Sequence, residues 1–226
     1  MRIKRRSILV NGIIVACAGL ILLYFYRSIT PTKQSTLVEC VLDAIGLAIV
    51  FFGQLLRISA RGYKSRQMDK NASLIATGPY ALVRHPMYFG SFLIGLGLVT
   101  ALLKIWVVPV YILLYLLWYR WQIYNEEKHL VQKFGQAYLD YSQTTSRFFP
   151  HLRVLVGLNL KECMPLRLEW IKKEWGTILA WVLVVAFFEG CYELQWYGVA
   201  ALLKELISLF LLMSVFLGFV FIFEKK

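Results

Sequence analysis

Long stretches without a charged residue constrain this chain more than any other feature. Residues 7–26 form a run of 20 uncharged residues, and residues 86–103 and 206–223 each form a run of 18. About 20 apolar residues in a helix cross a hydrocarbon core roughly 30 Å thick. Three shorter runs reach that length if a few flanking polar residues are accepted, namely 44–56, 105–119 and 176–188. The pattern predicts an all-α, polytopic integral membrane protein with about six transmembrane helices.

The distribution of basic residues predicts the orientation of these spans. The net charge is +12, with 25 Lys and Arg residues. With the N-terminus in the cytoplasm, the outer loops hold four of them, and 21 of the 25 lie on the inside, as the positive-inside rule requires. Both termini are then cytoplasmic, in a bacterial or archaeal inner membrane or in the endoplasmic reticulum. Topology and contact with membrane lipids explain the basic excess, so we expect no nucleic-acid partner.

The order of the segments predicts a core at 1–150 and a C-terminal extension at 151–226. In the core, helices are expected at about 7–27 and 37–58, followed by a tight antiparallel hairpin at 86–103 and 105–119. The extension is expected to hold an interfacial amphipathic helix at 160–175, with Trp and Leu against lipid. Two further spans, at about 177–196 and 199–223, close the chain. The first apolar run is interpreted as a retained helix rather than a signal peptide.

The stretch "GPYALVRHPMYFG" (78–90) places costly polar groups at the start of an apolar helix. Because a residue before proline avoids the α region and proline suits a first turn, His85 should lie outside the helix and Pro86 should begin it. The helix N-terminus, Arg84 and His85 together suit an anion such as a carboxylate. Gly78 and the following proline predict a turn that returns Tyr80 to this corner. A plain interfacial belt, with Arg84 snorkelling to the headgroups, explains the stretch about equally well.

A second polar cluster lies in "NEEKHLVQKFGQAYLDY" (125–141). Glu126 shares helical spacing with an apolar stripe, whereas Glu127 sits about 100° away. A carboxylate on a buried face needs a cationic partner or ligand. Pairing of a glutamate with Arg84 or Arg120 is one possibility, and a cationic group of a cofactor is another. The stripe consists of Leu130, Phe134, Tyr138 and Tyr141.

Taken together, "LIATGPYALVRHPMYFG" and "EEKHLVQKFGQAYLDYSQTTSRFFP" resemble the isoprenylcysteine carboxyl methyltransferase family and its phospholipid methyltransferase relatives. The resemblance covers roughly residues 45–150 and departs from the usual pattern at Thr77, which falls one place late. It implies a membrane enzyme that uses S-adenosyl-L-methionine. It also implies a cytoplasmic cofactor pocket, with contacts from Ser73, Leu74, Ile75, Tyr80, His85, Pro86, Met87, Tyr88 and Glu126. Because the four cysteines are scattered without metal-ligand spacing, we expect no metal site.

The candidate catalytic residues are Arg84, His85, Glu126 and Gln122. In the carboxyl methyltransferases, the position of Gln122 carries an arginine thought to hold the substrate carboxylate, and Arg120 is the nearest arginine here. The resemblance implies direct methyl transfer to a lipophilic acceptor that enters from the bilayer. The acceptor group stays open between a prenyl-cysteine carboxylate and a lipid amine or hydroxyl. A neutral Gln122 modestly favours the second.

Two other functions are compatible with such a chain. Membrane sterol reductases have similar C-terminal halves but use NADPH, and they are expected to show more basic residues and Asn-Tyr after the proline. The Met87–Tyr88 pair here favours methyl transfer. An inactive membrane scaffold of the same fold is the alternative outside enzymes, and the intact polar motifs argue against it. The sequence predicts no oligomeric state.

Overall fold

The computed structural model describes residues 37–68, 73–150 and 163–196, with some helical positions between 207 and 218. Within these residues every regular element is a helix, which agrees with the all-α prediction. The predicted span at 7–27 lies outside the described residues, and that at 199–223 lies largely outside them. The helices with defined bounds are α2 (Leu37–Met68), α3 (Pro79–Leu82), α4 (Pro86–Leu102), α5 (Val107–Phe134), α6 (Gln136–Thr144) and α9 (Leu168–Trp196).

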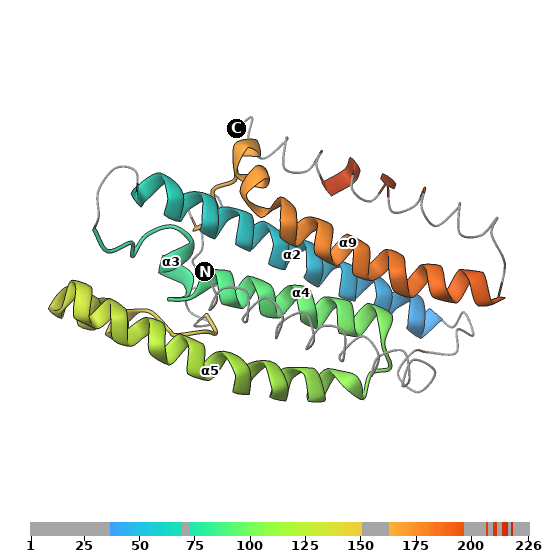
Figure 1. Ribbon diagram of the computed structural model, residues 1–226, viewed down its shortest axis with the longest axis horizontal. Coiled ribbons are helices and arrows are strands. Elements are labelled where there is room, and N and C mark those ends of the chain that lie inside the picture. Colours follow the sequence, from blue (N-terminus) through green and yellow to red (C-terminus); the bar gives the residue numbers. More distant parts are fainter. Residues whose placement is uncertain are drawn as a thin grey trace, which may run out of the picture.

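The four long helices run side by side, with α2 and α4 between α9 and α5, and α3 lies at one end of the bundle (Figure 1). Among the described helices, α2 is long and apolar enough to cross a membrane over Leu37–Gln67, and α4 is apolar but shorter. This apolarity fits a membrane protein. The count of six spans and the orientation of the pocket remain predictions.

Three helices extend beyond the spans expected from the charge-free runs. Helix α2 continues from residue 58 to Met68, α5 continues from residue 119 to Phe134, and α9 begins at Leu168 rather than near 177. Charged side chains do not interrupt the backbone hydrogen bonds of a helix, so a charge-free run marks only its apolar part. The long polar ends of α2 and α5 carry much of the site described below.

Helices α2 and α4 pack against each other through glycines. A Cβ atom added at Gly46 would lie 2.7 Å from the Gly97 carbonyl oxygen, and one at Gly53 would lie 2.8 Å from that of Gly90. The pairs 46–97 and 53–90 run in opposite chain directions, so the helices are antiparallel. Small residues that let helix backbones approach are typical of membrane interfaces.

Two tyrosines fix the hairpin of α4 and α5. The Tyr111 hydroxyl donates to the Phe92 carbonyl oxygen at 3.0 Å, and the Tyr115 hydroxyl donates to that of Tyr88 at 2.7 Å. Because the residue number rises along α5 as it falls along α4, the helices are antiparallel. The predicted hairpin is confirmed, with its turn at residues 103–106.

Helix α9 lies along α2 and shares a hydrophobic core with it (Figure 1). Trp170 is only 5% exposed, and its ring lies against Gly62 of α2. The Phe51 and Trp181 rings meet further along, with centroids 6.1 Å apart. The prediction that the Trp residues of segment 160–175 face lipid is therefore wrong for Trp170. The amphipathic pattern there arises because its apolar side faces α2.

The contact between α9 and α2 gives a stability prediction. A Cβ at Gly62 would lie 2.0 Å from Trp170 Cδ2, so Gly62→Ala must displace the indole. Overpacking of this kind costs about 1–3 kcal/mol. Gly176→Ala on α9 is the matched control, since its Cβ meets nothing within 4 Å. Thermal unfolding should show a lower midpoint for the first variant and an unchanged or higher one for the second. Equal midpoints for Gly62→Ala and wild type would contradict this docking.

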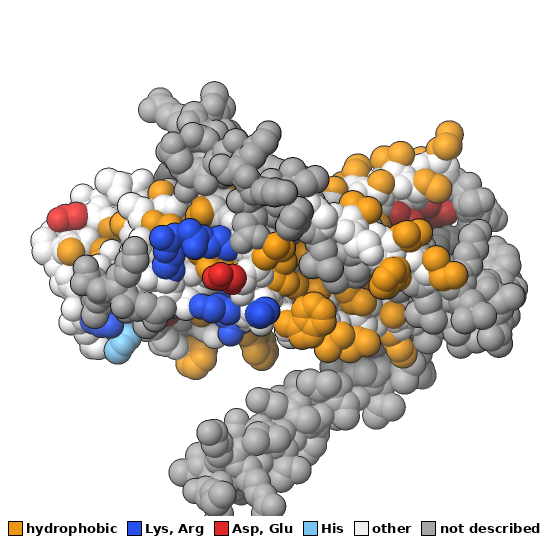
Figure 2. Space-filling model, turned by 90° about the horizontal axis from the view of Figure 1, so that it is seen from above, with side chains coloured by type: hydrophobic (Ala, Val, Ile, Leu, Met, Phe, Trp, Pro, Cys, Tyr) orange, Lys and Arg blue, Asp and Glu red, His pale blue; other side chains and the backbone are white. Residues whose placement is uncertain are grey.

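Charged and apolar side chains separate along the molecule. Figure 2 shows Lys and Arg side chains gathered toward the end that carries the long polar parts of α2 and α5. Hydrophobic side chains dominate the described surface toward the other end, which also carries an acidic patch. Large apolar residues on the outer side of α5 are exposed, among them Leu113, Leu117 and Trp118. An apolar body with a basic polar end is the distribution expected of a chain in a bilayer.

Candidate functional site

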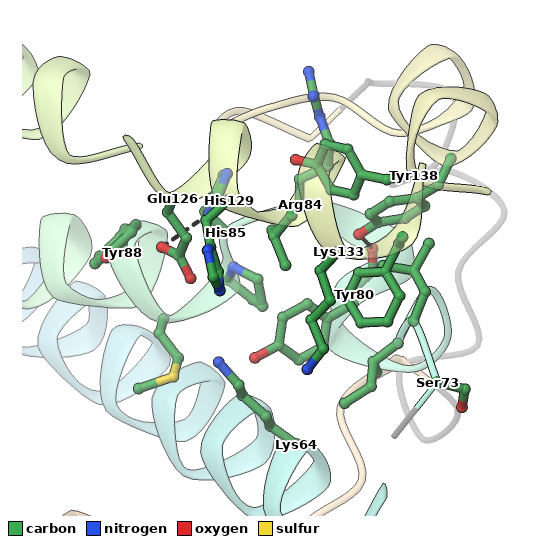
Figure 3. A pocket seen from close by; sticks show the side chains of 17 residues that line it. Lys64, Ser73, Tyr80, Arg84, His85, Tyr88, Glu126, His129, Lys133 and Tyr138 are labelled. Carbon is green, nitrogen blue, oxygen red and sulfur yellow. Dashed lines mark hydrogen bonds and ion pairs between the residues drawn. The ribbon is translucent and has the colours of Figure 1, made fainter. Parts of the chain in front are cut away.

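A cavity of about 450 Å³ lies at the basic end of the bundle (Figure 3). Its walls come from the end of α2, the segment before α3, α3 itself, the start of α4, the second half of α5 and α6. Arg84 and every residue predicted to contact a cofactor line this cavity. Those residues are Ser73, Leu74, Ile75, Tyr80, His85, Pro86, Met87, Tyr88 and Glu126.

A glycine turn brings Tyr80 to the cavity wall. Gly78 has φ +63°, a conformation that favours glycine, and Pro79 begins the four-residue helix α3. The Tyr141 hydroxyl then donates to the Tyr80 carbonyl oxygen at 2.6 Å, which ties this turn to α6. The predicted return of Tyr80 toward the start of α4 is confirmed.

The start of α4 places His85 beside the cavity. His85 precedes the helix with φ −123° and ψ 63°, and Pro86 is the first helical residue, as predicted. The imidazole is buried and stacks on the Tyr88 ring with centroids 5.7 Å apart. Since the first N–H groups of a helix lack intrahelical partners, this turn offers donors to a ligand.

The two adjacent glutamates differ from the prediction. Glu126 lines the cavity, as expected, but its side chain is 36% exposed. Glu127, predicted to lie off the apolar face, is the buried one, with its side chain only 10% exposed. The physical reason is segment 145–150, whose Ser146 carbonyl oxygen accepts from the Arg84 backbone N–H at 2.8 Å and whose Arg147 pairs with Glu127.

Glu127 joins three cationic or polar partners. Its Oε1 lies 2.8 Å from Arg84 Nη1 and 3.3 Å from His85 Nε2, and its Oε2 lies 2.7 Å from Arg147 Nη2. Burial raises the pKa of Glu127, but the His85 hydrogen bond and the charges of Arg84 and Arg147 outweigh burial and lower it. The pairing of a glutamate with Arg84, one of the two possibilities left open above, therefore applies to Glu127.

The lowered pKa of Glu127 predicts a pH dependence of stability. A carboxyl whose folded pKa lies below its ordinary value of 4.5 stabilises the fold fully above pH 4.5. That contribution is lost as the pH falls below 4.5 through the folded pKa. The difference in unfolding midpoint between wild type and Glu127→Gln should therefore be constant from pH 7 to about 5 and shrink toward pH 3. A difference that stays constant down to pH 3 would contradict the ionised Glu127.

Glu126 faces the cavity from the other side of His85. Its Oε2 lies 3.7 Å from His85 Nδ1, so the imidazole stands between the two glutamates. Burial, with the charge of Glu126, raises the pKa of the Tyr80 phenol, so Tyr80 stays neutral at physiological pH. The cavity thus presents a partly solvated carboxylate near two tyrosines, Tyr80 and Tyr88, a surrounding that suits a cation.

The helix that carries the apolar stripe is broken once. Gly135, with φ +54°, separates α5 from α6, where the sequence predicts one continuous rhythm. The stripe nevertheless keeps its common surface, because Leu130, Phe134, Tyr138 and Tyr141 all line the cavity.

Sequence reasoning missed two lysines of the cavity. Lys64 of α2 and Lys133 of α5 both line it, and Figure 3 shows their side chains directed toward the space beside Tyr80. His129 of α5 also lines it. The signal was available: Lys133 lies seven residues after Glu126 and therefore on the same helical face.

Gln122 does not line the cavity, although it is close enough to interact with the Tyr88 hydroxyl. Arg120 is exposed and also lies outside the lining. The described residues contain no group of three or more His, Cys, Asp or Glu placed to hold a metal ion.

Comparisons with known proteins agree with this arrangement. The sequence profile of the phospholipid methyltransferase family matches residues 41–137, which include α4 and most of the cavity wall. A protein-S-isoprenylcysteine O-methyltransferase of Tribolium castaneum is 33% identical over 119 residues, 49% of this chain and 42% of that protein. The protein of that name in Rattus norvegicus is 33% identical over 127 residues, 52% of this chain and 44% of that protein.

A cobalt-zinc-cadmium resistance protein of Cupriavidus metallidurans is 34% identical over 121 residues, 51% of each chain. This chain therefore spans about half the length of the curated relatives it matches, or less. No solved structure matches it. Residues 41–137, with their glycine turn, their Pro86 helix start and their paired glutamates, are thus similar to the phospholipid methyltransferase family and to the isoprenylcysteine O-methyltransferases.

Proposed function

We propose that the chain transfers a methyl group from S-adenosyl-L-methionine to a lipophilic acceptor in the membrane. The observation that carries this proposal is the gathering of nine implied cofactor-contact residues around one cavity. These residues are 53 positions apart at the extremes, from Ser73 to Glu126, and come from different elements. The names of the family and of two relatives support a methyltransferase.

The chemistry of the cavity fits this cofactor. A volume of about 450 Å³ lies within the range of roughly 300–1,000 Å³ found for small-molecule sites. Glu126 would hold the ammonium group, and the start of α4 with His85 would hold the carboxylate. The side chains of Leu74, Ile75 and Phe134 offer apolar surface for the base.

When bound, the cofactor supplies an activated methyl group on its sulfonium. The residues of the chain then act mainly by orientation: Glu126 and the α4 start fix one end of the ligand, and Tyr80 and Tyr88 present their rings to positive charge. Orientation of two reactants can lower a barrier by about 7–11 kcal/mol. Glu127 does not touch the ligand in this scheme. It holds Arg84 and His85 in place.

The acceptor would approach from the side of α4 and α5. An aromatic cluster continues from Tyr88 along these helices, and Tyr115 lies 4.2 Å from Tyr119 between ring centroids. Phe148 packs edge-on against Phe92 at 5.6 Å. This apolar, aromatic surface suits a lipid chain. The exposed apolar residues of the same helix α5, among them Leu113, Leu117 and Trp118, support entry from the bilayer.

A second candidate is an NADPH-dependent enzyme of the sterol-reductase type. One observation favours it: Lys64, Lys133 and Arg84 line the cavity, and a phosphate-rich cofactor would need such residues. Titration of the purified protein with S-adenosylhomocysteine and with NADPH separates the two functions. Binding of the first ligand alone supports our proposal. Binding of NADPH alone would overturn it. Binding of neither ligand would also overturn it and would indicate an inactive membrane scaffold instead.

The acceptor is tested with two substrates. The names of the relatives support a prenyl-cysteine carboxylate, whereas Gln122 lacks the fixed cationic fork that a carboxylate prefers. We expect wild type to methylate an aminophospholipid and Gln122→Arg to leave that activity no higher. Efficient turnover of a prenyl-cysteine by wild type, lost in Arg120→Ala, would show that the acceptor is the carboxylate instead.

A further inference from the structure

Glu174 of α9 carries a charge that the protein encloses completely. Its side chain has 0% exposed surface. A buried carboxylate is costly unless cationic donors pair with it. Two arginines of α2 do so: Arg57 Nε lies 3.0 Å from Glu174 Oε2, and Arg61 Nη1 lies 3.0 Å from Oε1. Arg57 Nη2 also donates to Oε1 at 3.4 Å, so a guanidinium fork holds the carboxylate.

The rest of the Arg57 guanidinium reaches the first turns of α4. Nη1 donates to the Met87 carbonyl oxygen at 3.4 Å and to the Ser91 hydroxyl oxygen. The Ser91 hydroxyl donates to the same Met87 carbonyl oxygen at 3.0 Å. The stem of Arg57 rests on Gly90, where an added Cβ would lie 2.6 Å from Arg57 Cγ. Arg57 therefore connects α9 with the beginning of α4.

That beginning of α4 is also a wall of the cavity. His85, Pro86, Met87 and Tyr88 all line it. The first turn of a helix has unpaired backbone N–H groups, so contacts from outside the helix largely determine its exact position. Arg57 makes such contacts from behind the cavity, and Glu174 fixes the direction in which Arg57 points.

We propose that Glu174 is a positioning residue for this site: it holds Arg57 against Met87 and Ser91 and so fixes the cavity wall at the start of α4. Helix α9 lies beyond residue 137, where the family match ends. The proposal makes this helix part of the functional unit rather than an appendage. Its effect on ligand affinity rests on the proposed function, but its effect on α4 does not.

The experiment compares Glu174→Gln with Glu169→Gln, an exposed glutamate in the first turn of the same helix. Both full-length variants are studied in detergent at a temperature where each is folded. Hydrogen–deuterium exchange is followed in peptides covering residues 85–95, and the dissociation constant of S-adenosylhomocysteine is measured. Arg57→Lys is the second test variant, because lysine keeps the charge but loses the fork.

Glu174→Gln and Arg57→Lys should speed exchange at residues 85–95 and weaken S-adenosylhomocysteine binding about tenfold, a size common for coupled neighbours. Glu169→Gln should change neither. If Glu174→Gln speeds exchange in α2 and α9 but not at residues 85–95, Glu174 serves only to dock α9, and the proposal is overturned. If wild type binds no S-adenosylhomocysteine, the proposed function fails, while the exchange result still decides the positioning role.

Discussion

Glu127→Gln is expected to lower the free energy of unfolding by about 3 kcal/mol, the lower end of the range for breaking a buried ion pair. The amide leaves Arg84, whose side chain is 13% exposed, without its carboxylate 2.8 Å away. It also releases segment 145–150 at Arg147. In a domain of this size the midpoint of thermal unfolding should fall by about 6–12 °C.

Two control variants separate the parts of this effect. Arg147→Gln removes a partner whose side chain is 55% exposed, and Glu127 keeps Arg84 and His85, so the midpoint of this variant should fall much less. Glu126→Gln changes the neighbouring glutamate, which is partly solvated, and should leave the midpoint nearly unchanged. If Glu126→Gln destabilises the fold as much as Glu127→Gln, the assignment of the buried charge to Glu127 is wrong.

The pair Glu126–Glu127 also shows what a sequence can predict about such a site. Helical spacing identified Glu126 as a cavity residue, because the stripe formed by Leu130, Phe134 and Tyr138 does line the cavity. Spacing could not reveal that Glu127 is buried. Its burial depends on Arg84 and Arg147, which lie 43 residues before it and 20 after it in the chain. Contacts of that range follow from tertiary folding and leave no periodic pattern in the sequence.

The fold likewise contains features that the sequence predicts and features that it does not. Pro86 and Gly78 act through their own backbone preferences, and the structure confirms the helix start and the turn that they predict. The pairing of α9 with α2 was missed because Glu174 meets Arg57 across 117 positions. From the sequence, Arg57 and Arg61 are equally compatible with solvated surface residues. Only their common partner shows that both reach a buried carboxylate, Arg57 from the interior and Arg61 from a position that is still 48% exposed.

The meeting of Lys64 with Lys133 could not be predicted from the sequence either, although helical spacing alone places Lys133 on the face of Glu126. Each lies on a helix whose charged part extends beyond the predicted span, and the two helices are separated by α4 in the chain. Their side chains converge on the cavity because α2 and α5 both extend past the start of α4 at the same end of the bundle (Figure 1). Helix lengths set by charge-free runs could not predict that convergence.

The second large effect concerns ligand affinity. Glu126→Gln is expected to weaken S-adenosylhomocysteine binding about tenfold or more, because a hydrogen bond to a charged group contributes about 1.5–3 kcal/mol. The glutamine keeps the size of the side chain and loses its charge. Glu127→Gln, measured at a temperature where it is folded, should weaken binding less, since Glu127 acts on the cavity only through Arg84 and His85.

The ligand supplies its own control for this prediction. Methylthioadenosine has the nucleoside and the sulfur of S-adenosylhomocysteine but lacks the amine and the carboxylate. If Glu126 binds the amine, Glu126→Gln should leave the dissociation constant of methylthioadenosine unchanged and raise only that of S-adenosylhomocysteine. An equal loss for both ligands would mean that Glu126 shapes the cavity, for example through His85 at 3.7 Å, rather than contacting the amine. Equal dissociation constants of S-adenosylhomocysteine for Glu126→Gln and Glu127→Gln would contradict the assignment of Glu126 to the cavity face.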